Sequence, residues 1–461
     1  MNDTTVAQRL AAFAAGLTVD ELPEAVGLRA KSCLLHALVV GLAGSVADFG
    51  RQAESTSVGV TDPRAGFARS LRSGHWHPVE SAAFINGVQL HARAQEDTHG
   101  TFHPGVCVIP AALATAEADN ADGATLLAAI VAGYEVGTAL SGSLTELTTP
   151  PFRATAVFGP VAAAAAAGRV RGFDADTMTS ALAIAVSMSG GTAESFGAGT
   201  DEWHFQSGSA AAIGVRAAQL AGAGVTGSPA AIESSSGFLE CFARDIAPSA
   251  FAADLGRVWN MLGVTFKPYP VCAFNQTPAL LAARFAQCGV EPRDISSITL
   301  RMNEREATYP GMPSAGPFTS VVSTLMSARF AFASALSRGD ITYATLLDFE
   351  SADITDTVAK ITLIAEPARR AKTAHAEVVL TDGTTHVNAI EDSDTLLSWD
   401  MDGVVANARR LASEAGLTAD QLQTLVDAVS SVESMAAPGP LVSAALAASH
   451  HHTDMEGPSH D

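Results

Sequence analysis

The sequence predicts a mainly α protein, with a large all-helical domain and a smaller α+β domain inserted into it. Apolar residues recur at helical spacing up to about residue 265, short β-branched segments follow up to about residue 395, and helical spacing then returns. The chain has 461 residues, of which 48% are hydrophobic and 16% charged. Because single cores stop growing well below this length, we expect two domains.

The first region, residues 1–265, reads as successive helices, most of them separated by Gly or Pro. Asp174 stands just before one apolar repeat and is a predicted N-cap. Few strands are expected here. The predicted helices cover residues 5–17, 23–42, 123–140, 157–170 and 174–189.

The second region, residues 266–395, is predicted to be the α+β domain. The segment TDGT at 381–384 separates two β-branched runs and is a hairpin turn signal. Helical pattern intervenes twice. Strands are predicted at 295–302, 358–364, 376–380 and 385–389, and helices at 278–287 and 319–337.

The third region, residues 396–449, is expected to return to the helical domain. Helices are predicted at 401–415 and 418–432, the second with Thr418 as its N-cap. The polar tail at 450–461, which ends in HHTDMEGPSHD, is expected to be flexible, although its histidines also offer metal ligands.

Composition limits the partners. With 48 acidic and 27 basic residues the formal charge is −21, which disfavours nucleic acid and anionic membrane surfaces. An anionic substrate then needs a local basic pocket. No long apolar run free of charge or frequent glycine is present, and the N-terminus lacks a basic start, so we expect no membrane span and a cytoplasmic location. The many alanines favour close helix packing and an oligomer.

One segment, NGVQLHARAQEDTHGTFHPGVCVIP at 86–110, gathers Asp97, His99 and His103 just before an alanine-rich helix. This density of titratable groups is typical of an acid/base site, in which the imidazoles exchange protons with a small-molecule substrate and Asp97 orients one of them. The alternative is structural, with the same side chains capping helices and loop backbone.

Two other patterns are weaker. The segment GAGVTG at 222–227 matches GxGxxG, but it follows a predicted helix at 210–221, whereas dinucleotide binding requires a preceding strand. His99 and His103 have the spacing of zinc ligands on a helix, yet Gly100 and Pro104 interrupt any helix there. No metal site and no cofactor are predicted. The five cysteines form no CxxC pair, so no disulfide framework is expected.

The chain resembles the MmgE/PrpD family, which includes 2-methylcitrate dehydratase, cis-aconitate decarboxylase and iminodisuccinate epimerase. The resemblance rests on several blocks in order: NGVQLHARAQEDTH, HPGVCVIPAALATAE, GATLLAAIVAGYEVG, FRATAVFGPVAAAAAAGRV, GAGTDEWHFQSGSAAAIGVRAAQLA, KPYPVCAFNQ and SARFAFASALSRGDIT. It implies a helical domain with an α+β lid domain, a homodimer and an active site between the two domains. It also implies acid/base chemistry without a cofactor or metal, as in the decarboxylase and epimerase members.

Position by position, the resemblance implies that part of the family site is kept and part replaced. Asp97, His99 and His103 are kept and are the predicted catalytic residues, whereas Ala94 stands at a position that is acidic in the family. The other predicted site residues bind substrate. They are Arg153 at a family histidine, Glu202, Trp203 at a family lysine, His204, Lys267, Tyr269, Gln276 at a family histidine and Phe330 at a family tyrosine.

These replacements remove a base, a cation and a phenol, and they make the predicted pocket less polar. Losing a charge-assisted hydrogen bond at Trp203 should weaken carboxylate binding by roughly 1.5–3 kcal/mol. The first hypothesis is therefore a diverged enzyme moving a proton next to a carbonyl or imine, with isomerisation, epimerisation or cyclisation as the outcome, in specialised metabolism. The second is a conventional family hydro-lyase or decarboxylase. The third is a non-catalytic dimer that binds a small molecule.

Overall fold

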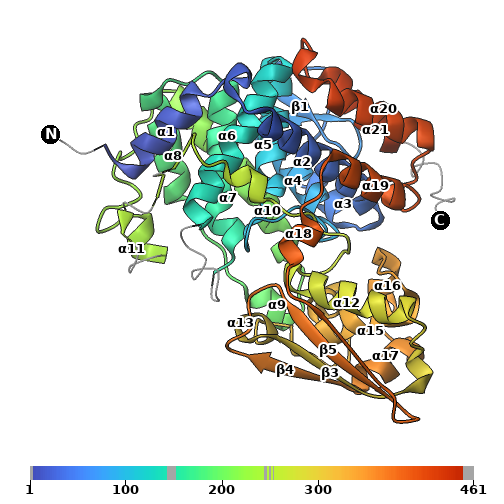
Figure 1. Ribbon diagram of the computed structural model, residues 1–461. Helices are drawn as coiled ribbons and strands as arrows, with labels where there is room; N and C mark the ends of the chain where they lie inside the picture. Colours follow the sequence, from blue (N-terminus) through green and yellow to red (C-terminus); the bar gives the residue numbers. More distant parts are fainter. Residues whose placement is uncertain (1–3, 143–151, 243–246, 249–250, 253, 450–461) are drawn as a thin grey trace.

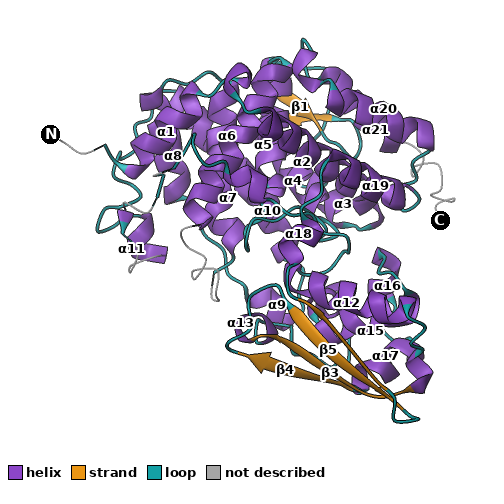
Figure 2. Ribbon diagram, viewed as in Figure 1, coloured by secondary structure: helices purple, strands orange, loops and turns teal. Residues whose placement is uncertain are grey.

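The computed structural model describes residues 4–142, 152–242, 247–248, 251–252 and 254–449. Most of them are helical, and a small four-stranded sheet stands apart from the main helical mass (Figure 1, Figure 2). The predicted mainly α fold class is thereby confirmed. The boundaries predicted at residues 265 and 395 stay predictions.

The helical part of the molecule begins with α1 and continues through α11, except that α9 lies beside the sheet part and contacts α14 (Figure 1). The five predicted helices are all present, and Asp174 caps α8 by accepting the backbone N–H of Thr177. A two-stranded antiparallel ribbon was not predicted because its strands have three residues each. The elements are α1 Val6–Gly16, α2 Glu24–Ala43, α3 Phe49–Glu54, β1 Phe67–Arg69, β2 Trp76–Pro78, α4 Val79–His91, α5 Gly105–Asp119, α6 Gly123–Gly142, α7 Ala154–Val170, α8 Ala175–Ser187, α9 Glu194–Ala198, α10 Trp203–Gly222 and α11 Phe238–Phe242.

Small residues let the central helices approach closely. At Gly214 of α10, a Cβ atom would stand 2.6 Å from the carbonyl carbon of Ala163 in α7. A run of buried alanines on α7, Ala162 to Ala167, continues this contact surface. Helices α7 and α10 therefore pack with their backbones close together, and large side chains have no room at this contact.

The sheet has the order β4-β3-β5-β6, with β3 and β4 parallel and the other pairs antiparallel. The predicted turn at 381–384 joins β5 to β6, and Gly383 adopts φ 88° there. Helices α12 and α15 lie against the sheet, and α17 packs on α15 (Figure 1). The elements are α12 Gln276–Gln287, β3 Ile295–Asn303, α13 Glu304–Ala307, α14 Val321–Met326, α15 Ala328–Arg338, α16 Tyr343–Leu347, α17 Ala352–Ala359, β4 Ile361–Glu366, β5 Ala374–Leu380 and β6 Thr385–Ile390.

Two predictions in this part need correction. The helix predicted over 319–337 is two helices, because Ser327 is extended and its side chain caps α15 at the backbone N–H of Phe330. The strand predicted from residue 358 begins at Ile361, since α17 occupies the residues before it.

The chain then returns to the helical part through α18 Ser393–Leu397, α19 Met401–Ala412, α20 Ala419–Ser430 and α21 Gly439–Ser449. Thr418 caps α20 in a capping box with Gln421, as predicted. Helix α19 packs against α2, so the two ends of the chain share one helical mass (Figure 1). The tail at 450–461 lies outside the described residues.

Two helical segments, Glu24–Val46 and Gly123–Gly142, are long and apolar enough to cross a membrane by length and composition. Their most apolar windows are 72% and 89% buried inside the protein. Such burial is typical of core helices, so these segments are weak evidence for a membrane span.

Candidate active site

A cavity of about 60 Å³, here called the inner cavity, lies where the helical part meets the sheet part. The connection between α4 and α5, residues 92–104, forms one side of it through Ala94, Glu96 and His103. Arg153, Trp203 and Lys267 line it as well. The sheet part contributes the remaining side of the lining. Its residues there are Cys272, Ala273, Phe274, Tyr309, Leu325 and Met326.

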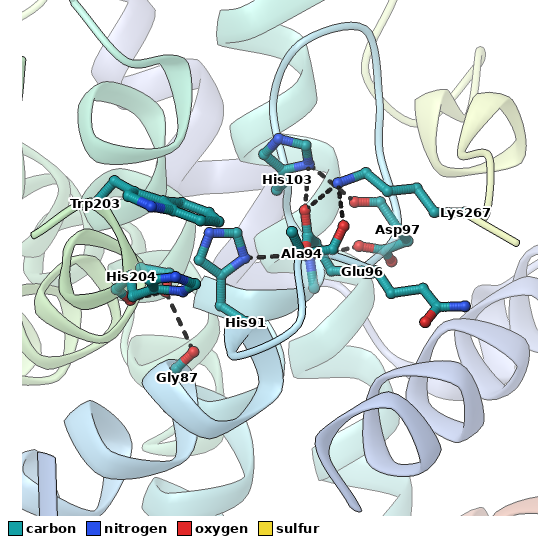
Figure 3. A network of polar contacts seen from close by, with 12 residues as sticks. Gly87, His91, Ala94, Glu96, Asp97, His103, Trp203, His204 and Lys267 are labelled. Carbon is teal, nitrogen blue, oxygen red and sulfur yellow. Dashed lines mark hydrogen bonds and ion pairs between the residues drawn. The ribbon is translucent and has the colours of Figure 1, made fainter. Parts of the chain in front are cut away.

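A single buried carboxylate organises this cavity. Glu96 Oε2 is 2.9 Å from His91 Nδ1, and Glu96 Oε1 is 3.1 Å from His103 Nδ1. Oε1 also accepts a close contact from the Lys267 ammonium (Figure 3). The Glu96 side chain is only 2% exposed, so its charge is balanced by protein groups and not by water.

The two histidines of this network are neutral at pH 7. Burial, partly opposed by the charge of Glu96, lowers the pKa of His91 to about 4. Burial and then the charge of Lys267 lower the pKa of His103 well below its usual value. Burial alone would raise the pKa of Glu96, but Lys267 and the two imidazoles hold it well below its usual value. An ionised carboxylate therefore faces two neutral imidazoles.

These charge states fix the tautomers. A carboxylate only accepts hydrogen bonds, so Nδ1 of each imidazole carries a hydrogen and donates a hydrogen bond to Glu96. Nε2 of His91 is then an acceptor and receives Nη2–H of Arg153 at 2.6 Å. Nε2 of His103 then carries a lone pair as well, and His103 lines the inner cavity. A carboxylate orienting an imidazole in this way is the arrangement of a general base.

Two cations border the network. Lys267 Nζ donates to the carbonyl of Ala94 at 2.9 Å, in addition to its contact with Glu96. Arg153 is the residue before α7, and its Nη1 donates to the carbonyl of Trp203 at 2.6 Å. Both predicted substrate-binding cations therefore lie in the cavity, already engaged with protein acceptors.

The predicted role of Asp97 as the residue that orients a histidine is wrong. Its carboxylate accepts the backbone N–H of Gly105 at 3.0 Å and the hydroxyl of Tyr134 at 2.5 Å, on the side away from the inner cavity. Only its backbone carbonyl approaches His103, at 3.4 Å from Nδ1. Burial raises the pKa of Asp97 to about 6. Asp97 thus anchors the start of α5, and Glu96 beside it faces the imidazoles.

His99 is separated from the other two imidazoles. Its backbone pairs with Phe102 across a tight turn, and its ring lines a second, larger cavity of about 500 Å³, here called the outer cavity. Burial lowers the pKa of His99 to about 4. The two predicted catalytic histidines thus line different cavities, and a catalytic role for His99 stays a prediction.

Several predicted substrate-binding residues lie outside the inner cavity. Glu202 is exposed on the surface, and His204 is buried between Phe49, at 3.6 Å between ring centroids, and Trp203, at 3.8 Å. Trp203 itself forms a wall of the cavity, as predicted for bulk at that position. Glu202 is the exposed residue before α10, and the His204 ring is held between two aromatic rings, so neither side chain lines the inner cavity.

The remaining predicted residues serve the sheet part and its contacts. Gln276 bonds through its side-chain amide to the backbone of Tyr269 and Val271. Tyr269 packs under the guanidinium of Arg410. Phe330 is fully buried, and Tyr309 supplies the phenol that lines the cavity.

Sequence reasoning missed Glu96, His91 and Tyr309. Glu96 and His91 lie in the same HARAQEDTH segment as the predicted residues, and the spacing of five between them was the available signal. Tyr309 is distant in sequence and carried no local signal. Among the described residues, no group of three or more His, Cys, Asp or Glu side chains has the geometry to hold a metal ion.

Comparison with known proteins supports a family assignment. The model of the MmgE/PrpD N-terminal domain matches residues 8–249. Cis-aconitate decarboxylase of Homo sapiens is 30% identical over 270 residues, which is 55% of this chain and 54% of the relative. The enzymes of that name from Mus musculus and Aspergillus terreus are 29% and 27% identical over 281 and 291 residues, covering 58% and 59% of this chain and 56% and 58% of each relative.

The chain thus spans little more than half the length of the relatives it matches. The matched domain includes α4, the connection at 92–104, α5, α7 and α10, which together carry His91, Glu96, His103 and Arg153. More than half of the sequence fits the family model, and the mainly helical fold agrees with it. The chain belongs to the MmgE/PrpD family.

Proposed function

We propose that the protein is a lyase-type enzyme that transfers a proton at the carbon next to a carboxylate of a small organic acid. The observation that carries this proposal is the contact of Glu96 with His103, because it leaves Nε2 of a neutral imidazole as a base at the lining of the inner cavity. No bound cofactor is needed for this step, in keeping with the family resemblance.

His103 takes the proton through Nε2 and becomes an imidazolium held against Glu96. The electron pair left on carbon delocalises onto the substrate carboxylate, where Lys267 stabilises the developing charge. The pair then expels a leaving group from the neighbouring carbon, which is the lyase outcome. In decarboxylation the carbon–carboxylate bond breaks, carbon dioxide leaves, and the electron pair left on carbon takes a proton that His103, neutral at rest, has first received from water.

The names of the relatives support the lyase outcome, since all three are called cis-aconitate decarboxylases. The cavity wall supports a second candidate, in which the proton returns to the same or another carbon, as in an isomerase, epimerase or cyclase. That wall is apolar at Ala94, Phe196 and Trp203, and it offers few partners for a third carboxylate. A substrate less acidic than cis-aconitate fits this wall better.

The test is incubation in D₂O with cis-aconitate, 2-methylcitrate and smaller mono- and dicarboxylates. Proton NMR follows deuterium entering carbon, and mass spectrometry follows loss of water or carbon dioxide. Product lacking carbon dioxide or water supports the lyase outcome, whereas deuterium in an unfragmented acid supports the isomerase outcome. His103→Gln should abolish both signals, and His75→Gln, at an exposed surface histidine, should abolish neither. Deuterium incorporation that survives His103→Gln would refute the assignment of the base.

We further propose a homodimer in the cytoplasm, supported by the family resemblance, the alanine-rich packing and the formal charge of −21. Light scattering coupled to size exclusion should give twice the 47.2 kDa chain mass. A monomer at micromolar concentration would contradict the dimer.

A further inference from the structure

The outer cavity adjoins the inner one. The two cavities share Thr101, Phe274 and Tyr309 in their linings, so these three side chains form the wall between them. The Tyr309 ring stands edge-on to the Phe274 ring, with 5.3 Å between centroids. Among the described lining residues, the charged side chains of the inner cavity do not reach the outer one.

The outer cavity is basic in a strongly acidic protein. Its described lining carries three cationic side chains, Arg305, Arg370 and Lys372, against two acidic ones, Glu306 and Asp394. Arg370 and Lys372 approach the same carboxylate, Asp394, at 3.3 and 3.8 Å. The single negative charge of Asp394 thus faces two positive charges. Burial raises the pKa of Glu306 to about 7, which further reduces the local negative charge near neutral pH.

Lys372 is held in an unusual backbone conformation. Its φ is +58°, a left-handed value that lysine rarely adopts. Its N–H donates to Glu306 Oε1 at 2.7 Å and its carbonyl accepts the hydroxyl of Thr277 at 2.9 Å. Strain of this kind persists only where surrounding contacts maintain it, and it concentrates at ligand-holding positions.

The small size of the inner cavity also indicates that a bound acid extends into the outer cavity. About 60 Å³ holds only a few water molecules, so an acid of more than a few heavy atoms extends beyond it. The outer cavity, at about 500 Å³, is the adjoining space, and its cations offset the negative potential that the whole protein presents to an anion.

We propose that the outer cavity is an anion-binding vestibule, in which Lys372 and Arg370 capture a carboxylate substrate before it passes Tyr309 and Phe274 to reach His103. This inference rests on the proposed function for its substrate class. Its test needs no turnover, so it succeeds or fails independently of the chemistry assigned to His103.

The experiment uses Cys272, a thiol that lines the inner cavity, as the reporter. Iodoacetate and iodoacetamide both alkylate a thiolate, with the sulfur bonding to the methylene carbon and iodide leaving, but only iodoacetate carries a carboxylate. The ratio of their labelling rates at Cys272 is measured on the full chain by peptide mass spectrometry. Cys241 and Cys288 are exposed and provide the ratio for the open surface of the same molecule.

In the unchanged chain we expect the iodoacetate-to-iodoacetamide ratio at Cys272 to exceed the ratio at Cys288 at least fivefold. Lys372→Met should lower the Cys272 ratio about tenfold and Arg370→Gln about threefold. Arg369→Gln is the matched control, because Arg369 adjoins Arg370 but pairs with Glu366 and Glu391 outside the vestibule. It should leave the ratio within twofold.

Burial raises the pKa of Cys272 to about 11, so its labelling is slow. Thr101→Cys therefore places a second reporter in the shared wall, and the same ratios are expected there. Three results would each overturn the vestibule. The first is an equal ratio at the cavity and surface thiols, and the second is an unchanged ratio in Lys372→Met and Arg370→Gln. The third is a fall in Arg369→Gln equal to that in the vestibule variants. Absence of labelling both at Cys272 and at the thiol introduced by Thr101→Cys would overturn it as well. An intact ratio in His103→Gln would uphold capture even where the proposed function fails.

Discussion

At the scale of single residues, the site depends on how one carboxylate divides its two oxygens. Glu96 gives Oε2 to His91 and Oε1 to His103 and Lys267, so one charge sets the tautomer of both imidazoles. His91 is thereby saturated, with Arg153 on its other nitrogen. His103 remains the imidazole with a lone pair available for chemistry.

Glu96→Gln should lower kcat about 10²- to 10⁴-fold, the range by which a positioned general base accelerates proton transfer. The amide no longer requires Nδ1 of His103 to carry the proton, so the reactive lone pair is lost from Nε2 in part of the molecules. The rate of deuterium incorporation measures this. Glu202→Gln, at an exposed carboxylate, is the control and should keep the full rate.

The same substitution leaves Lys267 buried without its anion, so folding must be measured beside activity. Removing one partner of a buried ion pair destabilises by about 3–5 kcal/mol. Urea unfolding of Glu96→Gln, Lys267→Met and the double variant should show partial recovery in the double variant. A double variant as unstable as the sum of the single ones would contradict the coupling.

The acid limb of the kcat/KM profile should lie below the ordinary imidazole pKa of about 6.5. His103 acts as a base when unprotonated, and burial together with Lys267 lowers its pKa, so activity persists as the pH falls through the range where a free imidazole protonates. Lys267→Met removes one of these causes and should move the limb to higher pH. A limb that stays in place, in a variant shown to be folded, would exclude Lys267 as a cause.

The sequence predicted which segment of the chain forms the site, but it did not predict which side chains of that segment contact one another. His103, Arg153, Trp203 and Lys267 line the inner cavity as expected. The sequence could not show that Glu96, and not Asp97, faces the histidines, because side chains in an irregular loop follow no fixed periodicity.

At the scale of helices and strands, prediction succeeded where a periodic pattern was long. The first helices, the β5–β6 turn and the N-cap at Thr418 were all predicted. It failed where a single side chain ended a pattern, as Ser327 does between α14 and α15. It also failed for β1 and β2, since three residues show no alternation.

One helix-scale contact predicts a pH dependence of stability. Glu135 of α6 accepts the backbone N–H groups of Asn260 and Met261 at the start of η4 Asn260–Gly263. Burial raises its pKa to about 7, above the unfolded value, so the folded state holds this proton more tightly. Its contribution is complete below about pH 4.5 and is lost as the pH rises through 7.

Glu135→Gln removes that dependence. The difference in unfolding free energy between Glu135→Gln and the unchanged chain should shift in favour of the variant by about 1–3 kcal/mol between about pH 5 and 8. Urea unfolding at each pH measures it. A constant difference across this range would show that Glu135 titrates normally.

At the scale of the whole molecule, net charge and helix packing have opposite effects on the stability of the folded state. A formal charge of −21 repels itself, while the small-residue helix contacts hold the core together. The two cavities lie where the helical and sheet parts meet, and this placement brings cations from both parts together.

Salt should therefore stabilise the protein. Raising NaCl from about 20 to about 200 mM shortens the Debye length from roughly 20 Å to under about 10 Å, which screens repulsion among distant carboxylates. Calorimetry should show Tm rising by a few degrees. A falling Tm would mean that surface ion pairs outweigh the net repulsion.

The backbone conformation of Ala94 affects which substitutions this position tolerates. Ala94 has φ +54°, a value that aspartate and asparagine tolerate better than alanine. An alanine codon ending in a pyrimidine is one base change from aspartate. Such a change would place a carboxylate in the lining of the inner cavity, at a residue whose backbone conformation favours aspartate.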